Sequence, residues 1–253
     1  MIAAGLVMPI DFSKTLENWD QVSDFAANPD YDPHHYTVPN SFGTVGVVVN
    51  TAQYKDPINT WADFYKAHHR IGMVDDPNAT FTTLYAALDK PLCDGSAATY
   101  KAMEKILLDQ RSSVVSYSFA NAIERVGAGD VSVQLGWYTF VHQNRDVNKN
   151  LTYIVPKGPA YVWNETFFVP KTAKNVPAAK KFLTFMLRPE NSGAFNNFVG
   201  YVPPVKGAEA YLDAALKASP ELDVIKSRAM VYQKACPLDV IQNQAKIWKK
   251  VMQ

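Results

Sequence analysis

The chain has little of several features that would fix its class at once. Its 253 residues include only two cysteines, Cys93 and Cys236, which lie far apart and form no CxxC pair. A zinc ribbon or a thioredoxin-like motif is therefore excluded, while a single disulfide remains open. No apolar run approaches the roughly 18 residues that a membrane helix needs, so we expect no direct membrane insertion.

The chain also lacks an excess of charge of either sign. It has 25 basic and 24 acidic residues, which gives a formal net charge of +1. Without a broad basic field, neither nucleic acid nor an anionic membrane is expected as the principal partner. Recognition of a charged ligand must then depend on a few local side chains.

Sequence signatures of enzymes are scarce. The chain has no GxSxG, HExxH or P-loop motif, and Gly127-Ala128-Gly129 lacks the third glycine of a dinucleotide fingerprint. The adjacent histidine pairs at 34–35 and 68–69 do not share a face of a helix or strand, so they do not suit a metal site. We predict no catalytic residue, metal or cofactor, and an enzyme hypothesis survives only because carboxylates can perform acid–base chemistry.

What the chain does have is an alternation of strand and helix patterns. Residues 44–49 (TVGVVV) are typical of a strand buried on both faces at the centre of a sheet. Asp76 and Pro77 predict an N-cap and the first position of a helix that runs to about residue 88. Further helices are expected over residues 59–67, 119–126, 175–187, 207–217 and 238–252, and strands over residues 70–74, 114–117, 131–135 and 167–169. This rhythm predicts an α/β fold with a parallel or mixed sheet, followed by a second, interwoven unit.

Aromatic and acidic residues fall where predicted runs end. Trp137, Trp163 and Tyr201 each close an apolar or glycine-marked run, and Glu165 lies two residues beyond Trp163. Ligands of open α/β sheets gather where strands end. Each ring contributes roughly 0.5 to 2 kcal/mol to binding of a cation, so two or three rings with a carboxylate predict a cage for an organic cation. The structural alternative is that the rings belong to the core and that Asp76 only caps its helix.

Longer phrases of the sequence point to a family. In chain order they are GLVMPID, YTVPNSFGTVGVVVNT, TWADFY, MVDDPNATF, VQLGW, YIVPKGPAYVWNETFFVPKTAKN, FLTFMLRPE and GYVPP. The chain resembles the spermidine/putrescine-binding proteins of bacterial ABC importers, which are periplasmic solute-binding proteins. The resemblance implies the type II two-lobe fold, in which hinge strands join the lobes and the ligand is trapped between them. We predict lobe one from residues 1–41 and 165–207, and lobe two from residues 42–164 and 208–253.

The resemblance also implies a set of ligand-binding residues. In the family, carboxylates pair with the ammonium groups of the ligand while aromatic walls hold its methylene chain. The family pattern maps onto Asp76, Trp137, Trp163, Glu165, Tyr201 and Gln233.

The sequence departs from the family pattern in three ways. Family members carry a further segment before GLVMPID, so the signal peptide, the start of the mature chain and part of lobe one are expected to be missing from this sequence. Ala79 stands where some spermidine binders have a glutamate. Glu165 replaces an aspartate, and its extra methylene extends the carboxylate by about 1 Å. These changes predict a ligand shorter than spermidine or differently charged, which leaves putrescine, another amine or a zwitterion open.

The sequence therefore predicts a periplasmic solute-binding protein that binds a polyamine or related small amine and delivers it to the membrane permease of an ABC importer. Two alternatives keep the fold. One is an amino-acid or opine-type ligand, and the other is a truncated sensor or interaction protein without a role in transport.

Overall fold

The computed structural model describes residues 1–233 and 235–253, which form two compact units. Unit 1 comprises residues 1–43 and 163–222, and unit 2 comprises residues 44–162 and 223–253. Two of the three passages between the units lie inside strands, β1 (Thr37–Thr44) and β7 (Ala160–Phe168). The third lies inside helix α10 (Pro220–Ser227). The predicted interweaving through crossing strands is therefore confirmed.

The last passage lies 15 residues beyond the predicted lobe boundary, at residue 222 instead of 207. The intervening residues are tied to α8 (Pro189–Val199) of unit 1. Asn197 Nδ2 donates to the carbonyl of Tyr211 at 2.8 Å, and the amide of Asp213 donates to Asn197 Oδ1 at 2.8 Å. The assignment of residues to lobes stays a prediction, because compactness defines the units and a lobe is defined by its motion.

Unit 2 is built on a five-stranded sheet with the order β4-β3-β5-β2-β6. The strands are β2 (Gly46–Asn50), β3 (Ile71–Met73), β4 (Val114–Tyr117), β5 (Val133–Gly136) and β6 (Leu151–Ile154). Strand β3 runs parallel to β4 and β5, whereas β2 runs antiparallel to β5 and β6. The predicted mixed sheet is confirmed. The buried β2 is an interior strand but not the central one, because β6 pairs on its outer side.

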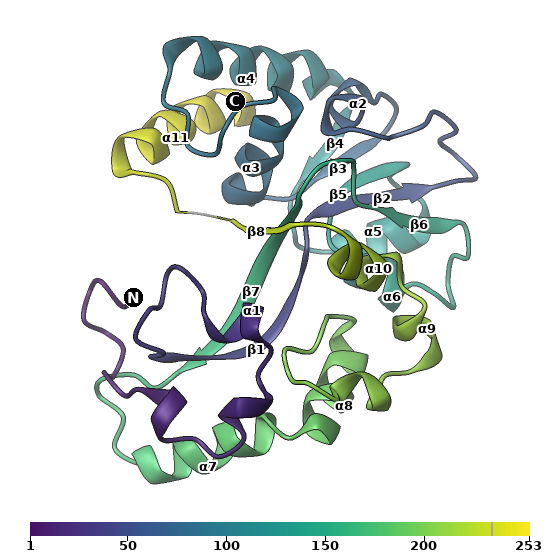
Figure 1. Cartoon of the computed structure of the whole chain (residues 1–253). Helices are drawn as coiled ribbons and strands as arrows, with labels where there is room; N and C mark the ends of the chain where they lie inside the picture. Colours follow the sequence, from purple (N-terminus) through teal and green to yellow (C-terminus); the bar gives the residue numbers. More distant parts are fainter. Residues whose placement is uncertain (234) are drawn as a thin grey trace. The chain divides into compact units, whose positions relative to one another are not determined.

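Helices cover this sheet. Those of unit 2 are α2 (Trp61–Lys66), α3 (Pro77–Ala87), α4 (Ala97–Gln110), η3 (Arg111–Ser113), α5 (Ala122–Ala128), α6 (Thr139–Gln143) and α11 (Leu238–Met252). Figure 1 shows α11 beside α4 and α3. Leu84 of α3 and Met103 and Leu107 of α4 are buried. The helix expected from residue 119 begins later, at Ala122, because Asn121 before it is left-handed.

A disulfide joins the two chain segments of unit 2. Cys93, in the loop between α3 and α4, is bonded to Cys236, just before α11, with 5.3 Å between the Cα atoms. The disulfide that the sequence left open is therefore formed. It fixes the segment that carries α11 to the part of the chain against which this helix packs.

Unit 1 has a core that residues from both of its segments share. Its helices are η1 (Phe12–Lys14), η2 (Trp19–Gln21), α1 (Asp24–Ala27), α7 (Val176–Met186), α8, η4 (Ala208–Tyr211) and α9 (Ala214–Lys217). Phe12, Val38, Leu183 and Leu187 are among the buried residues of the core. Strands β1 and β7 also belong to a three-stranded sheet of the order β1-β7-β8. The short β8 (Met230–Tyr232) is part of unit 2 and pairs with residues 160–162 of β7.

Pro189 opens the further helix α8, since proline suits the first helical position. One sequence expectation for unit 1 is wrong in detail. The helix expected over residues 207–217 is two short helices, η4 and α9, because Leu212 is extended and Asp213 caps α9. Within the described part of the chain, no helix has the length and apolarity to cross a membrane.

Candidate functional site

The carboxyl ends of three parallel strands meet at one edge of the unit 2 sheet. Asp75 and Asp76 follow β3, Phe119 follows β4, and Trp137 directly follows β5. We call Asp76, Phe119 and Trp137 the unit 2 edge. Two predicted site residues, Asp76 and Trp137, thus come from adjacent strands, at the kind of edge where α/β sheets bind ligands.

Asp76 has the structural role that the sequence offered as its alternative. Its Oδ1 accepts a hydrogen bond from the amide of Ala79 at 3.1 Å and so caps α3. Asp75 has a different task, since its Oδ1 accepts from the amide of Phe119 at 2.7 Å. Because a carboxylate has about four acceptor positions, the cap leaves Asp76 with further capacity to bind an ammonium group.

Trp137 belongs to an aromatic cluster. Its ring centroid lies 5.5 Å from that of Phe119 and 5.7 Å from that of Phe140. Phe140 is fully buried, whereas Phe119 is 48% exposed. Sequence reasoning missed Phe119 as a site candidate, because it was assigned to a helix. The signal that reveals it is its position just after the strand at residues 114–117.

Gln233 directly follows β8. Its amide donates to the carbonyl of Val162 at 3.0 Å, which continues the pairing of β8 with β7. Its side-chain Nε2 is buried and has no hydrogen-bond partner among the described residues. The predicted role of Gln233 as a polar contact stays a prediction.

In unit 1, strand β7 presents Trp163 and Glu165 on one face, since residues two apart in a strand point the same way. The residue between them points to the other face, where Asn164 Nδ2 donates to the hydroxyl of Tyr31 at 2.9 Å. This contact helps to fix which face of the strand carries Trp163 and Glu165.

Tyr201 reaches Trp163 through the end of α8. Gly200 closes the helix in the left-handed conformation, with φ 76°. Val202 then exchanges two backbone hydrogen bonds with Phe42 of β1, at 2.9 and 3.0 Å. As a result, the Tyr201 ring meets the Trp163 ring edge to face, with 4.5 Å between the centroids. The structure therefore brings together three predicted residues, Trp163, Glu165 and Tyr201.

A fourth residue, Glu221 in α10, belongs to this group, which we call the unit 1 cluster. Its side chain is buried, at 1% exposure. Burial raises the pKa of the Tyr201 hydroxyl to about 12, and the charges of Glu165 and then Glu221 add to the rise. Partial desolvation also raises the pKa of Glu165, although this residue is exposed. Sequence reasoning missed Glu221, since a glutamate in the first turn of a helix is ordinary.

The absence of a side chain at Gly43 leaves space for Trp163 and Glu221. A Cβ at this position would lie 2.5 Å from Cζ2 of Trp163 and 3.0 Å from Oε1 of Glu221. The indole edge and the buried carboxyl group thus converge beside the backbone of β1, where only glycine fits.

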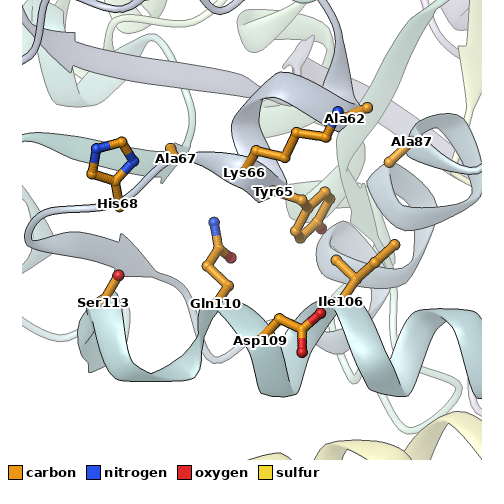
Figure 2. Close-up of a pocket in the computed structure, with 10 residues that line it drawn as sticks. All are labelled: Ala62, Tyr65, Lys66, Ala67, His68, Ala87, Ile106, Asp109, Gln110 and Ser113. Carbon is orange, nitrogen blue, oxygen red and sulfur yellow. The ribbon is translucent and has the colours of Figure 1, made fainter.

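A separate cavity of about 560 Å³ lies in unit 2 among α2, α3 and α4. Figure 2 shows Tyr65 and Gln110 among its lining residues. The Gln110 side chain is held by a hydrogen bond from its Nε2 to the carbonyl of Phe64 at 2.9 Å. None of the six predicted site residues lines this cavity. Over the described residues, no group of three or more acidic, histidine or cysteine side chains could hold a metal ion.

Comparison with known sequences identifies a family and several curated relatives. Residues 1–224 match the model of the bacterial extracellular solute-binding protein family. The spermidine/putrescine-binding periplasmic protein 1 of Haemophilus influenzae is 25% identical over 213 residues, which are 83% of this chain. The chain spans 59% of the length of this curated relative.

Comparison with solved structures identifies the fold. A spermidine/putrescine ABC transporter substrate-binding protein from Streptococcus pneumoniae has a TM-score of 0.85 at 21% identity, covering all of this chain and 79% of the other. A binding protein of A. tumefaciens in complex with glucopine has a TM-score of 0.72 at 19% identity, with 100% and 79% covered. The predicted α/β fold of a two-lobe solute-binding protein is therefore confirmed.

Proposed function

Because the chain belongs to the bacterial extracellular solute-binding protein family, we propose that it is the receptor of an ABC importer and that it binds a small organic amine. This family binds solutes and is not a family of enzymes. The observation that carries the proposal is the contact between Trp163 and Tyr201, with Glu165 on the same strand face as Trp163. Aromatic faces attract cations, and a nearby carboxylate attracts ammonium.

Each predicted residue has a role in this proposal. Glu165 and Asp76 accept hydrogen bonds from ammonium groups, and Gln233 makes a polar contact with the ligand. Trp137, Trp163 and Tyr201 cover its methylene chain. The ligand is a diamine such as putrescine, because Ala79 offers no carboxylate for a further amine. The relatives that are named for spermidine and putrescine support this ligand class.

We place the working protein outside the cytoplasm, where a membrane permease receives the solute. The disulfide between Cys93 and Cys236 supports this location, because disulfides persist in oxidising compartments and are rare in the cytosol. The curated relative is named as a periplasmic protein.

Isothermal titration of the purified, folded chain tests the proposal. The ligands are putrescine, spermidine, and a panel of amino acids and opine-like compounds. We expect micromolar or tighter binding of an amine. Trp163→Ala should weaken this binding more than tenfold, since one ring with its cation contact is lost. The matched control is Trp19→Ala, which removes a unit 1 indole that packs against His35.

The pattern across the panel separates the hypotheses. Binding of an amino acid or an opine, and of no amine, would replace the proposed ligand class and keep the receptor. An affinity for putrescine that survives Trp163→Ala would remove Trp163 from the site. A folded chain that binds nothing would favour a sensor or interaction protein of the same fold.

A further inference from the structure

Glu221 is the buried acid of the unit 1 cluster. It lies at the start of α10, and its side chain is 1% exposed. The cost of burying a carboxylate is high, so such groups persist where their charge or their hydrogen bonds are used. Its position beside an aromatic pair is therefore informative.

The geometry around Gly43 locates this carboxyl group. The point where a Cβ of residue 43 would lie is 2.5 Å from Cζ2 and 2.9 Å from Cε2 of Trp163, and 3.0 Å from Oε1 of Glu221. One carboxyl oxygen of Glu221 and the edge of the Trp163 indole thus both border the same point beside the backbone of β1. Tyr201 packs against the same indole.

We propose that Glu221 is a positioning residue of the amine site, which supports Trp163 from its edge and favours ligands with two positive charges over ligands with one. This inference rests on the proposed function. Because Glu221 is buried, it acts on the ligand through its charge and through the Trp163 ring, and Glu165 is the acid that contacts ammonium.

The electrostatics of the cluster agree with this role. The charge of Glu221 contributes to the raised pKa of Tyr201, so it acts across the aromatic pair. Within the described residues, the charged groups that act on Tyr201 are Glu165 and Glu221, and both are acidic. Salt screens a buried charge much less than an exposed one, so the attraction for a second ammonium persists at physiological ionic strength.

The test compares two amines of equal chain length, putrescine with two charges and butylamine with one. Isothermal titration gives the ratio of their affinities for the wild type and for Glu221→Gln, which keeps the shape of the side chain and removes its charge. We expect Glu221→Gln to weaken putrescine binding on the order of tenfold and to lower the ratio at least threefold, as for the loss of one charge at short range.

Two further variants make the result specific. Glu190→Gln makes the same chemical change at an exposed position of α8 in unit 1, and it should leave the ratio unchanged. Glu221→Asp keeps the charge and should restore most of the ratio. Thermal unfolding of each variant shows whether it is folded at the temperature of titration. A ratio that Glu221→Gln leaves unchanged would overturn the proposal, and so would a ratio that Glu190→Gln lowers equally.

A second readout does not depend on any ligand. The chain has 13 tyrosines, so NMR of ring-labelled tyrosine with Tyr201→Phe for assignment is needed to follow Tyr201 alone. Glu221→Gln should shift the titration of Tyr201 to lower pH. If the wild type binds neither amine, the proposed function fails. A lower pKa of Tyr201 in Glu221→Gln than in the wild type would still show that Glu221 is charged and acts on Tyr201. An unchanged titration would contradict the action of Glu221 on the aromatic pair.

Discussion

The unit 2 edge and the unit 1 cluster are assembled in different ways. In unit 2, Asp76, Phe119 and Trp137 follow the ends of parallel strands, so their meeting follows from sheet topology. In unit 1, the side chains meet because β1, β7, α10 and the end of α8 converge on one place. A strand end can be recognised from local sequence, whereas convergence depends on contacts between distant segments.

The comparison also separates two uses of carboxylates. Asp76 is partly buried and caps a helix through one oxygen. Glu165 lies on the same strand face as Trp163, while Glu221 is buried and borders the space at Gly43 that the indole edge also borders. A substitution in unit 2 should therefore alter stability and binding together, and a substitution in the unit 1 cluster should alter chiefly binding.

The largest effect is expected from the disulfide, because only unit 2 contains it. A double variant, Cys93→Ser with Cys236→Ser, should lose about 2 to 5 kcal/mol of unfolding free energy, since the bond closes a separation of 143 residues. Hydrogen exchange should rise in α3, α4 and α11. Equal deprotection of α7 and α8 in unit 1 would show that the units do not unfold separately.

The second-largest effect is expected from filling the space beside Trp163. Gly43→Ala inserts a Cβ within 2.5 Å of the indole, so the ring must move. We expect putrescine to bind about five- to tenfold more weakly, since cation–aromatic contacts depend on ring position. Gly95→Ala is the matched control, because its Cβ meets only ordinary contacts of 3.4 Å or more. Titration of both variants decides, and equal affinities would show that the ring position does not matter.

Asp76 allows its two roles to be separated. Asp76→Ala should cost about 1 kcal/mol of unfolding free energy, because the cap of α3 is lost, whereas Asp76→Ser keeps a capping oxygen. Both variants remove the charge and should weaken binding of putrescine. Chemical denaturation and titration measure the two effects. Wild-type affinity in Asp76→Ser would restrict Asp76 to its structural role.

The smallest expected effect is a dependence on pH. Partial desolvation raises the pKa of the exposed Glu165 above its usual value of 4.5. Between pH 4.5 and the raised pKa of Glu165, the folded chain holds more protons than the unfolded chain. The free energy of unfolding therefore falls as pH rises through this window. The affinity for the ligand depends on pH in the opposite direction and rises with pH, because an ammonium group binds the ionised carboxylate more strongly than the protonated one.

We therefore expect the affinity for putrescine to fall about threefold as pH decreases from 7 to 5, in line with partial protonation of one carboxylate. Glu165→Gln should bind more weakly at pH 7 and show a flatter profile. The measurement is titration at several pH values in one ionic strength. A profile that is as steep in Glu165→Gln as in the wild type would assign the dependence to another group.

Much of unit 2 could be predicted from sequence, because its signals are local. Asp76 with Pro77 marked the start of α3, and the run at residues 44–49 marked a buried strand. The strand β6 and the short β8 were missed, since neither has a strong apolar alternation. Phe119 was missed because its helix was started too early.

The unit 1 cluster could be predicted only in part. The ends of predicted runs pointed to Trp163, Glu165 and Tyr201, and the resemblance to a family mapped its ligand-binding residues onto the same three. Their role in binding stays a prediction. Gly43 and Glu221 carried no recognisable signal, because a close approach between β1, β7 and α10 is a property of packing. A single sequence does not reveal which glycine faces an indole from another part of the chain.

The divided course of unit 2 has a consequence for the order of events during synthesis. After residues 1–43, strands β2 to β6 leave the ribosome. The whole of residues 163–222 follows, and only then do Cys236 and α11 emerge. Until that moment α3 and α4 lack the helix that packs against them, so the apolar residues on that side stay exposed, as is typical of chaperone targets. Unit 2 can therefore complete its core and its disulfide only after almost the whole chain has been synthesised.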